Sequence, residues 1–354
     1  MILPKPKPDI ERFKKIILGQ IIPETPPLAE LFLDDAIIKA IGEEVLGLQW
    51  ITPTDRESRK KYRDFQIKVY YALGYDYFWV YGHPSFEVKG RSSATSNRVW
   101  SETHAGTITS YEDYYNYKWP VFTDEMLEDY YYVSDHLPDG MGMLVANGDG
   151  FLEVLMNNLI GYEAMCVMMF ENPELIKDIM DTVGQIIYDA CLKMMDVPKS
   201  AGIFMGDDMG FTTSTLFAPD FYRTHNLPWH KKLAKAAHDK EQLYLLHSCG
   251  QLESIMPDLI YDVKIDGKHS FQNESYDVCD YKKKYGKEIA ILGGVDVDML
   301  CRLGEDDLRK YIRHILEVCA PGGRYAFGTG NSVADYVPLK NYFIMLDERL
   351  KFTL

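Results

Sequence analysis

Short runs of apolar residues recur along the chain, and each is followed by polar residues and then by a pattern typical of a helix. Runs of this length, bounded by polar residues, are typical of buried strands. Strands that alternate with helices predict a parallel sheet, and eight such units predict a (β/α)8 TIM barrel. The eight runs span residues 28–33, 77–80, 143–146, 202–205, 243–246, 263–265 (continuing to 269), 289–292 and 325–327.

The length of the chain fits one barrel with two added segments. The 354 residues contain no linker and no repeat beyond the alternation itself, and α/β barrels often exceed the usual domain size. We therefore predict a single domain, residues 1–354, with an N-terminal helical extension over residues 1–48. Residues 84–120, after the second run, are rich in Ser, Thr, Tyr and Trp. Such an insertion is either a lid over the active-site face or a surface excursion.

Chemically active side chains follow these runs, at the strand ends where barrel enzymes carry their active sites. His247 and Cys249 end the run 243–246, and residues two apart on a strand point the same way. Imidazole and thiolate are ligands that zinc binds, so the pair predicts a zinc site; the alternative is a core cysteine beside a hydrogen-bonding histidine. Further candidates at strand ends are Tyr81, His83, Asn147, Asp207, Asp208, His269, Thr329 and Asn331.

Composition narrows the functional classes. A formal net charge of -15 argues against nucleic-acid binding. No stretch has the roughly 18 apolar residues of a membrane span, and the first residues lack a signal-peptide core. The six scattered cysteines form no compact disulfide framework, so we expect a cytoplasmic protein. The 25 tyrosines suit a pocket for an aromatic ring, although ordinary packing also explains them.

Several motifs in order resemble the C-terminal half of the uroporphyrinogen decarboxylase-like superfamily. The similarity covers about residues 140–350, and the N-terminal third matches only loosely. The motifs are Gly206-Asp-Asp-Met-Gly210, Ala218-Pro-Asp-Phe-Tyr222, Leu246-His-Ser-Cys-Gly250, Lys268-His-Ser-Phe271, Ile291-Leu-Gly-Gly-Val-Asp296, Ala320-Pro-Gly-Gly323 and Gly328-Thr-Gly-Asn-Ser332.

That superfamily contains true decarboxylases and corrinoid-dependent methyltransferases, and the chain resembles the second branch. The decarboxylases hold substrate carboxylates with an Arg-Gln-Ala-Gly-Arg motif, whereas residues 26–35 here carry carboxylates and no arginine. These charges would repel a polyanionic porphyrinogen. The methyltransferases bind zinc through His-X-Cys and a further cysteine after the eighth strand. His247 and Cys249 match the first part, but Thr329 stands at the last position.

Where relatives carry Glu-Asp after His-Ser-Phe, this chain has Gln272 and Asn273. With the thiolate absent at Thr329, the resemblance leaves His269, Asp207 or Glu274 to complete a zinc site on His247 and Cys249. Neutral Gln272 and Thr329 keep the capacity to hydrogen-bond a substrate.

The resemblance implies transfer of a methyl group from a small substrate to a corrinoid. An aryl methyl ether suits the aromatic composition best, which would make the protein an O-demethylase component. The corrinoid would belong to a partner protein, since the chain has no Asp-X-His-X-X-Gly motif. Zinc would act as Lewis acid on the leaving atom, with Asp207 or Asp208 as proton donor and His269 as a further acid–base group. Because adjacent strand residues point oppositely, we expect one aspartate to matter, and favour Asp207. Substrate contacts are expected from Tyr81, His83, Asn147, Gln272, Thr329 and Asn331.

Three other readings stay open. A methylcorrinoid:thiol methyltransferase would use the same zinc to activate a thiol. A metal-free lyase would rely on Asp207, Asp208 and His269 as acid–base groups. A non-catalytic binding subunit of a methyl-transfer complex would need none of these groups intact. A homodimer is compatible with all of them.

Overall fold

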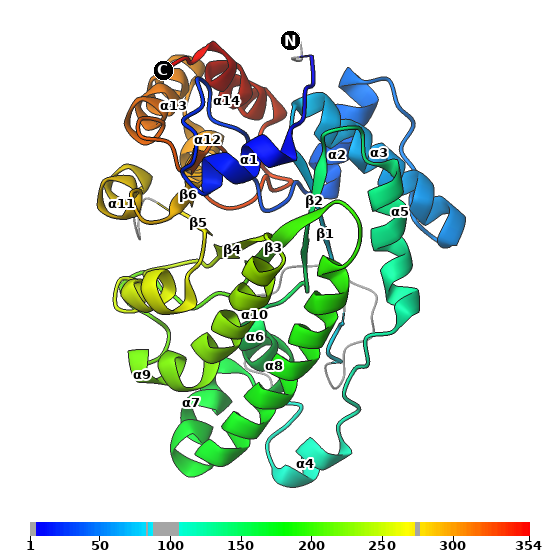
Figure 1. The fold of residues 1–354 in the computed structure, drawn as a ribbon, viewed down its shortest axis with the longest axis vertical. Coiled ribbons are helices and arrows are strands. Elements are labelled where there is room, and N and C mark those ends of the chain that lie inside the picture. Colours follow the sequence, from blue (N-terminus) through cyan, green and yellow to red (C-terminus); the bar gives the residue numbers. More distant parts are fainter. Residues whose placement is uncertain (1–4, 83, 88–105, 273–276) are drawn as a thin grey trace.

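The computed structural model describes residues 5–82, 84–87, 106–272 and 277–354. Its strands form one parallel sheet in which each strand pairs with the next along the chain (Figure 1). The described strands are β1 (Tyr77–Tyr81), β2 (Gly142–Ala146), β3 (Ser200–Gly206), β4 (Leu243–His247), β5 (Gly267–His269), β6 (Ala290–Leu292) and β7 (Tyr325–Ala326).

Residues 28–33 take the remaining place beside β7. Leu28 bridges Phe327 and Leu33 bridges Val333, both in parallel. The Ala29 N–H donates to the Phe327 carbonyl at 2.8 Å, and the Phe327 N–H donates to the Pro27 carbonyl at 2.7 Å. The sheet is therefore curled, with seven ladder strands and this bridged segment. The predicted (β/α)8 barrel class is confirmed.

One predicted strand begins too early in the sequence. Residues 263–265 do not form a strand; Val263 closes the π-helical segment η5 (Asp258–Val263), and Lys264 has a left-handed φ of 65°. The strand begins instead at Gly267. Val263 and Ile265 are apolar because they pack in the core between sheet and helices. A short apolar run alone does not distinguish such a turn from a strand.

Helices follow most strands and cover the outside of the sheet. Of the predicted insertion 84–120, residues 88–105 lie outside the described part, and the rest includes α4. The helical elements are α1 (Ile10–Ile17), α2 (Asp35–Ala40), η1 (Ile41–Val45), α3 (Arg56–Leu73), α4 (Tyr111–Asn116), η2 (Asp124–Leu127), α5 (Glu128–His136), α6 (Phe151–Glu153), η3 (Val154–Leu159), α7 (Tyr162–Glu171), α8 (Pro173–Met195), α9 (Pro219–Phe221), η4 (Tyr222–Asn226), α10 (Leu227–Asp239), η5, α11 (Val278–Tyr285), α12 (Val297–Arg302), α13 (Glu305–Cys319) and α14 (Leu339–Lys351).

The strands separate an inner core from an outer one. Phe204 and Leu245 belong to the inner cluster, whereas their neighbours Met205 and Leu246 pack outside. This alternation follows from the two-residue repeat of a strand. Helix α1 covers the amino end of the strands, since Ile10 lies against Gly142 at the start of β2. Helices α4, α7 and α9 lie at the opposite end of the molecule (Figure 1).

No helix within the described ranges has the length and apolar character needed to cross a membrane.

Candidate metal centre

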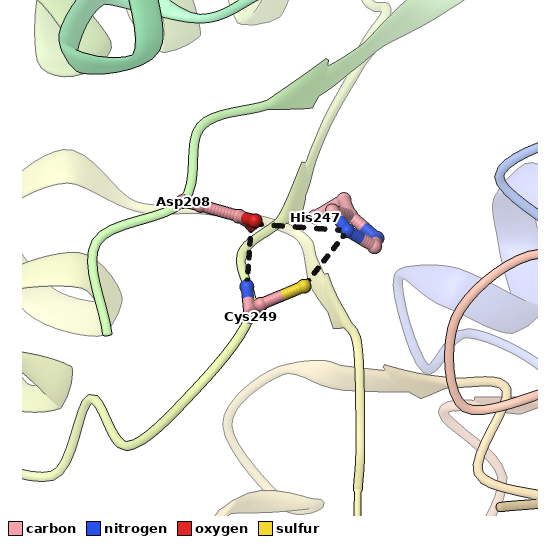
Figure 2. Close-up of side chains that lie close together, drawn as sticks. All are labelled: Asp208, His247 and Cys249. Atoms are coloured by element: carbon pink, nitrogen blue, oxygen red, sulfur yellow. Dashed lines mark hydrogen bonds and ion pairs between the residues drawn. The ribbon is translucent and has the colours of Figure 1, made fainter. Parts of the chain in front are cut away.

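The strand register brings two of the predicted residues, His247 and His269, to one level of the barrel. Gly206 of β3 pairs with His247 of β4, which pairs with His269 of β5. Because Phe204 points into the barrel, alternation directs Gly206 and Asp208 inward as well, and Asp207 outward. The same repeat directs Cys249 to the side of His247. Figure 2 shows Asp208, His247 and Cys249 turned toward one another.

These three side chains form a group with the dimensions of a metal site. Their ligand atoms lie within 4.8 Å of one another. The Cys249 Sγ is 3.5 Å from His247 Nε2, and the Asp208 Oδ1 is 3.9 Å from the same nitrogen. A tetrahedral zinc with ordinary bond lengths separates its sulfur and nitrogen ligands by about 3.6 Å. The donor atoms and their spacing therefore fit Zn²⁺.

The hydrogen bonds of His269 fix the tautomer of His247. His269 Nε2 lies 3.1 Å from the Thr329 carbonyl, which can only accept, so this nitrogen carries the hydrogen. Burial lowers the pKa of His269 to about 3, so the ring is neutral and its Nδ1 accepts. His247 Nδ1, 2.8 Å away, must donate to it. His247 Nε2 then carries a lone pair on the side of Asp208 and Cys249, as a metal ligand requires.

Burial works against negative charge in this group. It raises the pKa of the Cys249 thiol well above its usual range, and the neighbouring Asp208 raises it further. The pKa of Asp208 is also raised by burial, although bonds from Cys249 oppose this shift. Burial and the charges of Asp208, Asp207 and Asp149 raise the pKa of Glu153 well above its normal value. A divalent cation would favour the deprotonated forms of Cys249 and Asp208.

Asp207 lies outside this group. Its buried carboxylate accepts from the backbone N–H groups of Leu152 at 2.9 Å and Glu153 at 3.0 Å. It also accepts from Asn226 Nδ2 at 2.9 Å and from His230 Nε2 at 2.8 Å. These contacts join the start of α6 to η4 and α10. The placement favours Asp208 over Asp207, which the sequence had favoured, as the aspartate that faces the site.

The predicted substrate contacts are distributed over several surroundings. Asn331 Nδ2 donates to Cys249 Sγ at 3.5 Å. The Thr329 hydroxyl faces outward and donates to the buried Glu30, so only its carbonyl reaches His269. Asn147 is buried and donates to the Asp149 carbonyl at 2.6 Å.

Four further candidates remain, and two of them lie outside the described residues. Tyr81 is exposed and stacks on Trp79 with ring centroids 4.1 Å apart. Gln272 is exposed. His83 and Glu274, the latter predicted as a metal ligand, lie outside the described residues.

The sequence interpretation missed Lys268, Ser270 and Glu153. Lys268 is 2% exposed, and its Nζ donates to the carbonyls of Ser248, His269 and Ser270. Burial lowers the pKa of Lys268 to about 8, while the charges of Cys249 and Asp208 raise it. A charged residue between Gly267 and His269 at a predicted strand end was the available signal.

A parallel barrel with imidazole, thiol and carboxyl side chains at the carboxyl ends of its strands has the architecture of barrel enzymes. Residues 153–352 match the family model described as uroporphyrinogen decarboxylase (URO-D), and the chain belongs to this family. The resemblance seen in the sequence motifs is thereby confirmed.

Two solved structures share the fold. A methyltransferase from Methanosarcina mazei superposes with a TM-score of 0.73 at 15% identity, covering 98% of this chain and 99% of that one. A putative vitamin-B12 independent methionine synthase from Listeria monocytogenes gives a TM-score of 0.54 at 12% identity, with 94% and 98% covered. No curated protein matches the chain significantly.

Proposed function

We propose that the protein is a zinc-dependent methyltransferase that moves a methyl group from a small methylated substrate to the corrinoid of a partner protein. The observation that carries the proposal is the group Asp208, His247 and Cys249, whose ligand atoms lie within 4.8 Å of one another. Membership of the URO-D family and the fold shared with a protein named as a methyltransferase support it.

The ligands favour activation of a leaving atom over activation of a thiol. One thiolate and one carboxylate would balance the charge of Zn²⁺. Oxygen is a harder ligand than sulfur and donates less charge to the metal. Zinc held there would act as a Lewis acid on the atom that loses the methyl group. A thiol methyltransferase would gain more from a sulfur-rich set, which the described residues do not place at this site.

Glu153 is the carboxyl group best suited to hold a proton near that atom. Its pKa is raised well above the normal value by burial and by the carboxylates of Asp208, Asp207 and Asp149. A proton retained at neutral pH is available to a leaving oxygen or nitrogen as it becomes basic. In this assignment Asp208 is a ligand, Asp207 secures α6, and His269 orients His247.

An aromatic wall supports an aryl methyl ether as the substrate. Phe32 stacks on Trp79 at 5.9 Å between ring centroids, and Trp79 stacks on Tyr81. Phe204 connects this wall to the ligand group, since its ring lies 6.3 Å from Trp79 and 5.7 Å from His269. The stacked rings and the ligand group therefore share one end of the barrel interior.

The test combines the zinc-loaded protein with a reduced corrinoid protein and a methoxylated aromatic acid. We expect methylcorrinoid, seen by absorbance, and the demethylated phenol in equal amounts, and neither product without the corrinoid. Cys249→Ser should lose metal and turnover together, because a hydroxyl replaces thiolate poorly. Release of carbon dioxide without methyl transfer would establish the lyase reading instead. Methylation of an added thiol by methylcorrinoid, with no aryl ether cleaved, would establish the thiol methyltransferase.

A further inference from the structure

The sulfur of Cys249 accepts hydrogen bonds from two other strand ends. The Ser270 hydroxyl, just after β5, donates to Sγ at 3.3 Å. The Asn331 amide, beyond β7, donates to the same sulfur at 3.5 Å. The sulfur is thus held from two directions, while His247 Nε2 lies 3.5 Å away on a third.

Ser270 has an unusual backbone conformation. Its φ is +85°, in the left-handed region that residues other than glycine rarely adopt. Such a conformation is strained and persists only where the surroundings impose it. The next residue, Phe271, is fixed by donation of its N–H to the Gly330 carbonyl at 2.8 Å. The turn that presents the hydroxyl to Cys249 is therefore held on both sides.

Lys268 is the group that imposes this turn. Its ammonium donates to the Ser270 carbonyl at 2.7 Å, to His269 at 3.2 Å and to Ser248 at 3.3 Å. The side chain is buried, and Nζ lies 4.4 Å from the centre of the Phe271 ring. An ammonium has three donors, and here each one meets a carbonyl of the two loops that carry Cys249 and Ser270.

We propose that Ser270, Asn331 and Lys268 are positioning residues that orient the Cys249 sulfur and reduce the charge it donates to a bound metal. The inference rests on the proposed metal centre and deepens it. A thiolate that accepts two hydrogen bonds is a weaker donor, so the metal becomes a stronger Lewis acid. These hydrogen bonds on the sulfur suit cleavage of a methyl–oxygen or methyl–nitrogen bond, where the leaving atom must be made less basic.

Cobalt(II) in place of zinc reports on both effects. Its thiolate-to-metal charge-transfer band measures sulfur donation, and competition with a chelator measures affinity. In Ser270→Ala and Asn331→Ala we expect the charge-transfer band at lower energy, because the sulfur donates more charge to the metal. We expect the affinity for the metal to fall by roughly ten- to hundred-fold, because the sulfur is no longer held in its orientation. Lys268→Met should act through Ser270, so the double variant with Ser270→Ala should lose less than the sum of the two single losses.

Two matched variants separate these effects from loss of stability. Lys282 is another buried lysine that donates to backbone carbonyls, those of Gly323 and Arg324. Ser134 is another buried serine, and it donates to the Pro198 carbonyl at 2.6 Å. Lys282→Met and Ser134→Ala should lower Tm without moving the cobalt band or the affinity.

Each outcome has a defined meaning. An unchanged band and affinity in both Ser270→Ala and Asn331→Ala would overturn the inference and leave the metal centre standing. Recovery of affinity in Ser270→Gly, which relieves the left-handed strain without restoring the hydroxyl, would overturn it as well. Wild-type protein that binds no cobalt or zinc would remove the metal centre, and the inference with it. If Lys268→Met does not fold, the Ser270 and Asn331 variants decide alone.

Discussion

Replacing Asp207 and Asp208 one at a time by asparagine should separate structure from metal binding. Both changes remove one negative charge, at adjacent positions that follow the same strand. Asp207 is buried among helix α6, η4 and α10, whereas Asp208 faces His247 and Cys249. We expect Asp207→Asn to lower the free energy of unfolding and to keep the metal. We expect Asp208→Asn to lose the metal and to stay nearly as stable as the wild type.

The expected loss of stability follows from the number of hydrogen bonds that each carboxylate accepts. Four groups donate to Asp207, those of Leu152, Glu153, Asn226 and His230. A hydrogen bond to a charged group contributes about 1.5–3 kcal/mol and a neutral one about 0.5–1.5 kcal/mol. An amide in place of the carboxylate therefore costs roughly 1 kcal/mol per donor, or about 4 kcal/mol in all. Asp208 accepts the Cys249 N–H at 2.7 Å, which gives about 1 kcal/mol by the same reasoning.

Urea unfolding followed by tryptophan fluorescence gives the two stabilities, and elemental analysis of the folded proteins gives zinc per chain. A loss of about 4 kcal/mol is a large part of the stability of an ordinary domain, so Asp207→Asn is measured at low temperature. The reasoning is refuted if Asp207→Asn loses zinc at unchanged stability. It is refuted equally if Asp208→Asn unfolds early and keeps its zinc.

Three further predictions follow from buried groups. Cys249→Ser should bind zinc at least tenfold more weakly, as measured by competition with a chelator; equal affinity would remove the thiolate from the site. Burial raises the pKa of the Cys249 thiol, so zinc binding should release at least one proton and weaken as the pH falls. A calorimetric binding enthalpy that is the same in buffers of different ionisation enthalpy would contradict this. Burial raises the pKa of Glu30 from 4.5 to about 8. The stability that the protonated carboxyl contributes is therefore fully present below about pH 4.5 and is lost as the pH rises to about 8, a total of about 5 kcal/mol. Glu30→Gln should remove this decline in stability between pH 5 and 8, and a decline equal to that of the wild type would show that Glu30 stays ionised.

The alternation of apolar and polar positions predicted the barrel, and one strand shows where that signal ends. Val263 and Ile265 are apolar because they pack in the core under helices, not because they form a strand. The real strand, Gly267–His269, contains Lys268 between a glycine and a histidine, and none of the three is a residue type enriched in strands. Lys268 is accommodated there because three backbone carbonyls surround its ammonium. Such compensation is tertiary, so no local pattern reveals it.

The same limit separates the predicted site residues that the structure brings together from the rest. His247 and Cys249 were found because residues two apart point the same way, whichever way that is. A choice between Asp207 and Asp208 requires knowing which face of β3 is inside the barrel. Phe204 and Met205 are both apolar, as expected of a parallel strand that is buried on both faces. Only the assembled sheet, in which Phe204 points inward, assigns the faces.

The absence of a cysteine at position 329 has a different meaning once the faces are known. In the sequence, Thr329 counted against a metal because it stood where relatives carry a thiolate. In the structure its hydroxyl points outward to Glu30, and an acidic group faces the ligand pair from the other side, at Asp208. In the proposed site, the third ligand comes from the end of β3 rather than the eighth strand, and it is an oxygen rather than a sulfur. A harder ligand and a hydrogen-bonded sulfur both make the metal more electrophilic. The oxygen ligand and the hydrogen-bonded sulfur then act in one direction, toward activating a leaving atom.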